Sequence, residues 1–389
     1  MFDFPNSPTL NQQVVMPDGT VRQWDGTKWK AGGATATGPY LPLSGGAMSG
    51  AMTVVGNAAA ALQPVPLQQL SSTLATTAPA LNNVGRNVLH NGLFNVQQRG
   101  AATFSTGGVY TADRWKMDLS LDTFTVQPNV LGDSQRAQIG DEAAQNCLIC
   151  QTTGNAGAAS YSFISQPIEN VYRLANKTVI VSFWAYSSNG LPRFSVGMRQ
   201  YFGSGGSPSA LVDLNAVPVS LTATATRYSV TFAMPSIIGK TVGTNGDHYN
   251  RLSFWLSSGA NTNTLAGGIG VQSGNVILWG VQLEIGSVAT PLEKLDPVLQ
   301  LQQCQRFYSI GMINLGGYTG GGGGNASIYP FPVWMRASPT ITPSFSTQTN
   351  CGSSQINSQY NGFGYQAFTV GTALGQFSLA GTFTASADL

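Results

Sequence analysis

The stretches TVIVSFWAYS (178–187), RFSVGMRQYF (193–202) and RLSFWLS (251–257) decide the fold class of this chain. In each stretch, apolar residues occupy alternate positions, as Leu252, Phe254 and Leu256 do in the third. Successive side chains of a β-strand point to opposite faces of its sheet, so this period of two predicts strands with one buried face. The chain is therefore expected to be mainly β.

The same alternation recurs on both sides of these stretches. Further alternating runs lie at 121–128, 147–153 and 227–234, and turn residues separate them. No amphipathic pattern of helical period intervenes. Many short strands without helices predict a β-sandwich or jelly roll. We assign residues 87–291 to one such domain.

The other face of the three opening strands is a candidate ligand-binding surface. It mixes aromatic rings with Ser, Gly and Arg, a combination that a dry core does not favour. If the three strands share a sheet, these side chains line one outer surface on which a sugar ring can stack. Subunit interfaces have a similar composition, so packing against a neighbouring subunit is the alternative. The ligand-binding residues predicted in this way are Trp184, Tyr186, Arg199, Tyr201 and Trp255.

Residues 1–31 are predicted to form a small β module. Two Asp-Gly pairs mark tight turns between very short strands, and Trp24 and Trp29 are the expected packing pair. A unit of this size is not stable alone, so we expect it to dock onto a larger particle. Residues 32–86 follow, with a Gly/Ala/Thr-rich linker and a helix-compatible stretch.

The string LPLSGGAMSGAMTV (41–54) resembles the repeat of phage tail-fibre and baseplate-fibre proteins. In that family three chains wrap around one axis. Gly45 and Gly46 suit the crowding at such an axis, and Met48 suits its apolar lining. The segment has too little apolar surface to fold as a single chain, so the resemblance implies an obligate homotrimer. Only one copy of the repeat is present, which implies a short shaft.

The two ends of the predicted jelly roll carry a second resemblance. NVLHNGLFNVQQRG (87–100) opens the domain and VILWGVQLEIGSVATP (276–291) closes it. This pair resembles the carbohydrate-binding-module-like jelly rolls of phage tail fibres. The resemblance implies binding of a host-surface glycan.

Residues 292–389 are expected to form a helical junction and a C-terminal β-domain. Apolar residues at helical spacing predict a helix over 292–306. The string LDPVLQLQQCQRFY (295–308) resembles the helix-to-strand junction of phage tail proteins, and FPVWMRASPTITP (331–343) resembles fibre C-terminal β-domains.

The glycine run within residues 316–325 gives a second candidate site. Its composition predicts a flexible loop, and a loop at the far end of a fibre suits recognition of varied surfaces. Tyr318 and Asn325 are the candidate ligand-binding residues there. A plain connector is the alternative interpretation.

The low charge of the chain argues against several function classes. Charged residues make up 9% of it, against about 25% in ordinary soluble proteins, and the net charge is +2 without any Lys/Arg cluster. Nucleic-acid binders carry concentrated basic patches, so that class is disfavoured. No apolar stretch approaches the roughly 20 residues of a membrane-spanning helix, and no signal-peptide pattern opens the chain. We expect synthesis in the cytoplasm without membrane insertion.

No catalytic or cofactor motif appears in the sequence. Its two histidines lie in polar, turn-like segments, and no nucleophile motif accompanies them. Cys147 and Cys150 form a CxxC, but residues three apart on a strand face opposite sides, so we expect neither a metal site nor a redox pair. Whether Cys304 or Cys351 cross-links subunits stays open.

Together these patterns predict a virion structural protein without enzymatic activity or cofactor. The favoured interpretation is a homotrimeric tail-fibre-type appendage that attaches the particle to host-surface glycans. Residues 1–31 are then the contact with other virion proteins. A purely structural collar, neck or head fibre is the alternative, and a glycan depolymerase is the third possibility, since scattered carboxylates are available for a glycosidase pair.

Overall fold

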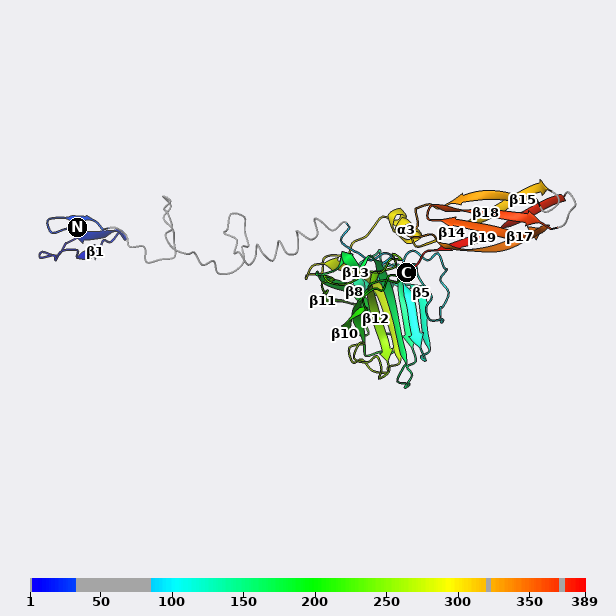
Figure 1. Ribbon diagram of the computed structural model, residues 1–389. Coiled ribbons are helices and arrows are strands. Elements are labelled where there is room, and N and C mark those ends of the chain that lie inside the picture. Colours follow the sequence, from blue (N-terminus) through cyan, green and yellow to red (C-terminus); the bar gives the residue numbers. More distant parts are fainter. Residues whose placement is uncertain (1, 33–84, 320–322, 371–374) are drawn as a thin grey trace. The chain divides into compact units, whose positions relative to one another are not determined.

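The computed structural model describes residues 2–32, 85–319, 323–370 and 375–389 (Figure 1). The fibre repeat at 41–54 and the helix-compatible stretch after it lie outside the described residues, as does the predicted trimerising segment apart from its ends at 32 and 85–86. The described chain is mainly β, as predicted. None of the helices in this part of the chain is long and apolar enough to cross a membrane.

Residues 2–32 contain one antiparallel sheet with the order β1-β2-β3. The tight turns expected at the Asp-Gly pairs join its strands. The rings of Trp24 and Trp29 lie 5.6 Å apart and Phe4 stacks on Trp29 at 5.0 Å, so the tryptophans form the predicted packing pair. The strands are β1 (Gln13–Val15), β2 (Val21–Trp24) and β3 (Trp29–Ala31).

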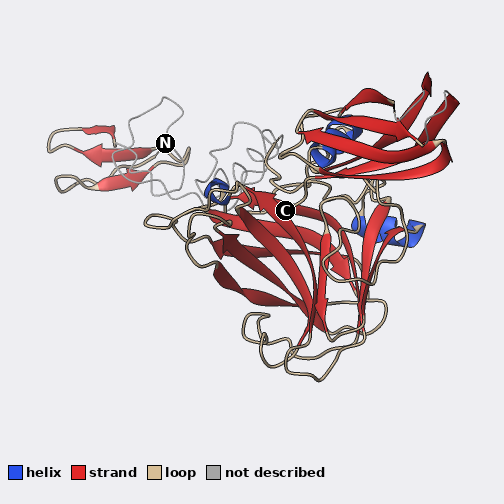
Figure 2. Ribbon diagram, turned by 45° about the vertical axis from the view of Figure 1, so that its right-hand side comes forward, coloured by secondary structure: helices blue, strands red, loops and turns tan. Residues whose placement is uncertain are grey.

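The largest domain is a sandwich of two five-stranded antiparallel sheets, which Figure 2 shows with loops at its ends. We name each sheet after its central strand. The β12 sheet has the order β10-β9-β12-β7-β4: Val212–Ser220, Arg193–Tyr201, Tyr249–Ser258, Tyr161–Glu169 and Lys116–Ser120. The β13 sheet has the order β11-β8-β13-β6-β5: Thr226–Ala233, Thr178–Tyr186, Gly274–Ile285, Asn146–Thr152 and Phe124–Val130.

The core of the sandwich lies between the two sheets. Phe183 of β8 meets Phe254 of β12 at 5.2 Å and Phe194 of β9 at 5.5 Å between ring centroids. All three rings are fully buried. Each buried aromatic side chain removes a large apolar area from water, so this cluster contributes strongly to the stability of the domain. The apolar faces predicted from alternation are the faces that pack here.

The sequence-based expectation that this domain lacks helices is wrong in one place. A short helix, α2 (Asp133–Ile139), follows β5. Its only buried residue is Ile139, so the sequence has no amphipathic pattern that predicts this helix. Gly140 ends the helix in the left-handed region at φ 71°, where its N–H donates to the carbonyl of Arg136. A single 3-10 turn, η1 (Val171–Arg173), follows β7.

The predicted helix at 292–306 is real but shorter. Helix α3 spans Pro297–Gln305, because the Asp296 side chain caps its start by accepting from the N–H of Val298 at 2.8 Å, and Pro297 occupies the first turn. Only Gln300 and Cys304 are buried in it. The apolar residues that gave the helical spacing, such as Leu299, are largely exposed.

The predicted C-terminal β-domain is a second, smaller sandwich. Its three-stranded sheets pack around buried rings that include Phe363, Phe377 and Phe383. One sheet has the order β14-β19-β16: Tyr308–Thr319, Gly375–Ser386 and Thr340–Thr349. The other has the order β15-β18-β17: Gly324–Pro330, Gly362–Thr369 and Cys351–Gln359.

The four cysteines are free thiols. Cys150 belongs to the core between the sheets, whereas Cys147 belongs to a separate cluster on the outer side of the β13 sheet. The two side chains of the CxxC therefore face opposite sides of β6, as strand geometry predicts. Burial raises the pKa of the Cys147 thiol to about 12 and raises that of Cys150 as well.

Candidate ligand-binding face

The five residues predicted to line one surface fall on two different sheets. Trp184 and Tyr186 lie on β8 in the β13 sheet, whereas Arg199, Tyr201 and Trp255 lie on β9 and β12 in the β12 sheet. The expectation of a single shared surface is therefore wrong. Alternation shows which side of a strand faces the core, but it does not say to which of two opposed sheets the strand belongs.

The two aromatic residues of β8 are engaged in packing. Trp184 and Tyr186 pack against a buried cluster on the outer side of the β13 sheet. This cluster includes Leu93 from the segment before β4 and Trp279 from β13, and Leu292 packs against it. Side chains covered in this way stabilise the domain and do not offer a free stacking surface.

Trp255 is also covered. Its side chain is only 4% exposed, its ring lies 4.4 Å from that of Phe163, and Ala266 and Ile269 complete the cluster. The indole Nε1 donates to the Ser253 hydroxyl at 3.1 Å. The loop that carries Ala266 and Ile269 thus covers one end of the β12 sheet.

The other end of the β12 sheet carries a face formed by four residues, which we call the tyrosine–arginine face: Tyr201, Tyr249, Arg199 and Arg251. Tyr249 pairs across the strands with Tyr201, and Arg251 pairs with Arg199. The four alternate along β9 and β12 with the core residues Met198 and Leu252, so they point outward. None is fully buried.

The two tyrosines form an aromatic pair on this face. Their ring centroids lie 4.8 Å apart. Burial raises the pKa of the Tyr249 hydroxyl, so it stays protonated and able to donate at neutral pH. Paired rings with polar edges are the usual means by which proteins hold the apolar face of a sugar.

The two arginines of this face differ in their hydrogen-bond and ion-pair partners. Arg199 forms a bidentate ion pair with Asp213 of β10, at 2.5 and 2.8 Å. Arg251 makes no side-chain hydrogen bond or ion pair with any residue that the structure describes, and its buried Nε has no partner. Its guanidinium lies 4.9 Å from the centre of the Phe163 ring. Burial, and then the charge of Arg199, lower the pKa of Arg251.

An unsatisfied arginine beside two tyrosines is a donor set for a polar ligand. Leaving a buried donor unpaired costs about 1–3 kcal/mol, and a ligand oxygen at Arg251 recovers that cost. Sequence reasoning included Arg199 and Tyr201 but missed Tyr249 and Arg251. The signal was present, because Arg251 opens RLSFWLS (251–257) on the same side as Ser253, and Tyr249 continues that alternation toward the N-terminus.

Tyr318 and Asn325 lie in strands, contrary to the predicted loop. Tyr318 is near the end of β14 and is 69% exposed, and Asn325 is in β15, where its amide donates to the Gly316 carbonyl at 3.1 Å. The alternation of these strands is hidden by glycine, which has no side chain to reveal it. Residues 320–322 lie outside the described part of the chain.

The two histidines have different surroundings, and His248 directly precedes Tyr249 of the tyrosine–arginine face. His248 accepts from the backbone N–H of Val171 through Nδ1 at 3.1 Å, the hydrogen-bonding loop role expected for it. His90 packs on Phe307 at 5.7 Å between ring centroids. Among the described residues, no group of three or more His, Cys, Asp or Glu residues is placed to hold a metal ion.

No family model and no curated protein matches this chain. Solved structures with similar folds include the enzymatically active domain of tailspike protein 4 from bacteriophage CBA120, at 11% identity and a TM-score of 0.30. That match covers 51% of this chain but only 21% of the tailspike chain. A further similar structure is a family 4 carbohydrate-binding module, at 14% identity and a TM-score of 0.29, covering 50% of this chain and 98% of the module.

A xylan-binding family 22 module from Paenibacillus barcinonensis is similar at 10% identity and a TM-score of 0.28. The match covers 48% of this chain and 99% of the module. At such values no function carries over from these proteins to this chain.

Proposed function

We propose that this chain is a homotrimeric tail-fibre-type appendage of a phage particle and that it attaches to host-surface glycans through the tyrosine–arginine face. The observation that carries the proposal is the pairing of Tyr249 and Tyr201 beside the unsatisfied guanidinium of Arg251. Stacking on the rings holds the sugar, and hydrogen bonds to the arginine fix its orientation.

The fibre part of the proposal rests on the sequence. The string at 41–54 resembles the repeat of phage tail fibres, and such a segment needs sister chains to bury its apolar residues. Residues 2–32 form three very short strands around two tryptophans, a module small enough to require a partner surface. Both features support virion attachment through this module as part of the proposal.

Two alternatives remain in different classes. In a purely structural collar, neck or head fibre, the tyrosine–arginine face packs against a neighbouring subunit and binds no sugar. A glycan depolymerase, by contrast, consumes its ligand. Purified protein that lowers the viscosity of a polysaccharide solution favours the enzyme over both other functions.

A glycan array tests the proposal. The full chain is applied to surface polysaccharides and lipopolysaccharide fragments of bacteria, together with the variants Tyr249→Ala and Arg251→Gln. Tyr318→Ala is the matched control, because Tyr318 is exposed on the C-terminal domain. We expect wild type and the control to bind the same glycans and both face variants to lose them while keeping the wild-type sedimentation coefficient.

Two results overturn the proposal. If Tyr249→Ala and Arg251→Gln disrupt the trimer but still bind glycan, Tyr249 and Arg251 belong to a subunit interface. Binding that is lost in Tyr318→Ala and kept in both face variants moves the ligand site to the C-terminal domain.

A further inference from the structure

A pocket of about 460 Å³ lies at the junction between the jelly roll and helix α3. It adjoins the tyrosine–arginine face, because Glu169 of its wall pairs across the strands with Tyr249. Its volume falls within the range of about 300–1,000 Å³ that small-molecule sites occupy. Four segments build it: the opening of the domain, the turn before β4 that carries Arg114, the end of β7 with the η1 turn, and α3 with the residue after it. The wall includes His90, Arg114, Glu169, Arg173, Gln303 and Arg306.

The wall of this pocket carries three arginines and one carboxylate. Glu169 is engaged by Arg306, whose Nη2 lies 2.9 Å from Oε1. Arg114 is 1% exposed and reaches outside the wall to Asp388 at 3.1 Å. Arg173 makes no ion pair and no side-chain hydrogen bond with any described residue. Burial lowers the pKa of Arg173 and the charge of Glu169 opposes that shift, so Arg306 and Arg173 share one carboxylate.

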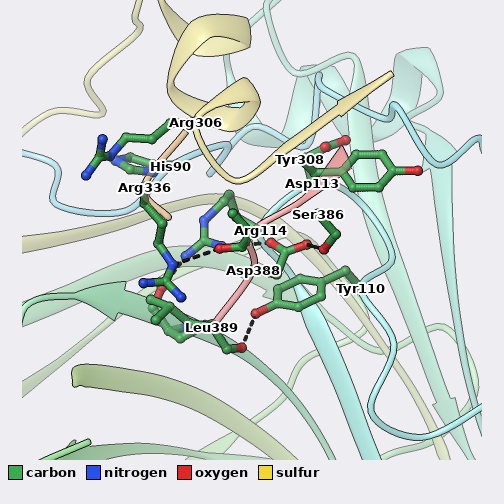
Figure 3. Close-up of polar contacts among 12 residues, drawn as sticks. His90, Tyr110, Asp113, Arg114, Arg306, Tyr308, Arg336, Ser386, Asp388 and Leu389 are labelled. Atoms are coloured by element: carbon green, nitrogen blue, oxygen red, sulfur yellow. Dashed lines mark hydrogen bonds and ion pairs between the residues drawn. The ribbon is translucent and has the colours of Figure 1, made fainter. Parts of the chain in front are cut away.

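Several polar atoms around the pocket lack partners. The buried Nε of Arg114 and the buried Oε1 of Gln303 have none. The His90 ring makes no hydrogen bond among the described residues, and Figure 3 shows it near Arg306. Burial, followed by the charges of Arg114, Arg173 and Arg306, lowers the pKa of His90 to about 3, so the ring is neutral and keeps an acceptor nitrogen.

The polar atoms around this pocket match a ligand that carries two kinds of hydrogen-bonding group. Arg173 is free to donate to an anionic acceptor, whereas Gln303 Oε1 and the neutral His90 can accept from hydroxyl donors. Val88 and Ile168 add an apolar patch on the wall for the face of a ring. We propose that this pocket binds a sugar unit that carries a carboxylate or a phosphate. The inference rests on residues other than the four of the neighbouring tyrosine–arginine face, and not on the function proposed for that face.

Saturation-transfer NMR with the full chain tests this assignment. The probes are methyl β-glucuronide, glucose 6-phosphate, the neutral methyl β-glucoside and inorganic phosphate. We expect an anionic sugar to bind and the neutral glucoside to bind at least about tenfold more weakly, since a hydrogen bond to a charged group contributes about 1.5–3 kcal/mol. Preference for glucuronide or for glucose 6-phosphate identifies which anion the arginines recognise.

Arg173→Gln is the decisive variant, because Arg173 is exposed and holds no structural contact that its loss would break. It is expected to weaken the anionic sugar about tenfold without changing the melting temperature. Arg193→Gln, an exposed arginine outside the pocket, is the matched control. Gln303→Leu provides a second readout by removing the acceptor for a sugar hydroxyl and is expected to weaken sugars but not inorganic phosphate.

Four outcomes overturn the inference. They are no binding of either anionic sugar, equal binding of the neutral glucoside, inorganic phosphate binding as tightly as glucose 6-phosphate, and anionic-sugar binding that neither Arg173→Gln nor Gln303→Leu changes. Loss of binding in Tyr249→Ala alone assigns the sugar to the tyrosine–arginine face instead, so failure here and failure of the proposed function are distinguishable.

Discussion

Arg114 Nη1 lies 3.1 Å from Oδ1 of Asp388, the penultimate residue of the chain, and joins the jelly roll to the end of the C-terminal domain (Figure 3). Arg99 binds the second oxygen of the same carboxylate. The Arg114 guanidinium also lies 3.5 Å above the Phe307 ring, and Tyr110 donates to the carbonyl of Leu389. The last two residues therefore fasten the two sandwiches together.

Asp388→Asn tests this junction. Both arginines are largely buried. Removal of the carboxylate charge leaves Arg114 without an ion-pair partner, whereas Arg99 keeps Asp113. Breaking a buried ion pair costs about 3–5 kcal/mol. We expect the free energy of unfolding in urea to fall by about 3 kcal/mol. Asp133→Asn is the control, since Asp133 is 93% exposed in its pair with Arg136 and such pairs contribute at most about 1 kcal/mol. Equal losses in both variants contradict the role of Asp388.

His90 makes stability depend on pH. Its folded pKa of about 3 lies below the ordinary value of 6.5, so the unfolded chain takes up a proton that the folded chain does not. The stabilisation is complete above about pH 6.5 and is lost as the pH falls toward 3, by about 1.4 kcal/mol per pH unit. We expect wild type to lose about 3 kcal/mol more than His90→Gln between pH 7 and pH 4. Urea unfolding at several pH values measures this, and parallel profiles for the two proteins are the contrary result.

Trp255→Ala separates packing from binding. Because Trp255 is 4% exposed against Phe163, its truncation leaves a cavity and is expected to cost about 3–5 kcal/mol. Trp334, which is 67% exposed, is the matched control, and Trp334→Ala is expected to cost less than about 1 kcal/mol. Thermal unfolding compares the two. A stable Trp255→Ala protein that has lost glycan binding reinstates Trp255 as a ligand residue.

The thiols differ in accessibility. Cys147, Cys150 and Cys304 are buried, whereas Cys351 is partly exposed. Burial raises the pKa of all four thiols, so accessibility is what distinguishes Cys351. The thiolate is the reactive form, so an aromatic disulfide reagent is expected to label one thiol per chain within minutes in the native protein and four after denaturation. Fewer than four in denaturant without reductant indicates a disulfide between subunits.

Much of the fold is readable from the sequence because one physical rule governs it. Alternation identified Phe183, Phe194 and Phe254 as core residues, since a sandwich strand with one buried face must place apolar residues at every second position. Strand β7 does not show this alternation. It is buried on both faces from Ser162 to Ile168, so its sequence does not alternate.

The site was less predictable because it depends on which strands are neighbours. The sequence around Trp184 and that around Trp255 look alike, yet β8 and β12 lie in opposed sheets. Local pattern carries no information on this choice, which the connections and the packing of the whole domain decide. The pocket beside His90 is harder still to predict, because its residues come from four separate segments. The strings at 87–100 and 295–308 hold some of these residues but do not reveal that the segments meet.

The most direct test of the central claim is a crystal structure of the full chain with an oligosaccharide selected on the glycan array. We predict a sugar ring in van der Waals contact, at about 4 Å, with Tyr201 or Tyr249, and a sugar oxygen hydrogen-bonded to the Arg251 guanidinium. An ordered oligosaccharide bound elsewhere, with this face covered by a neighbouring subunit, contradicts the account.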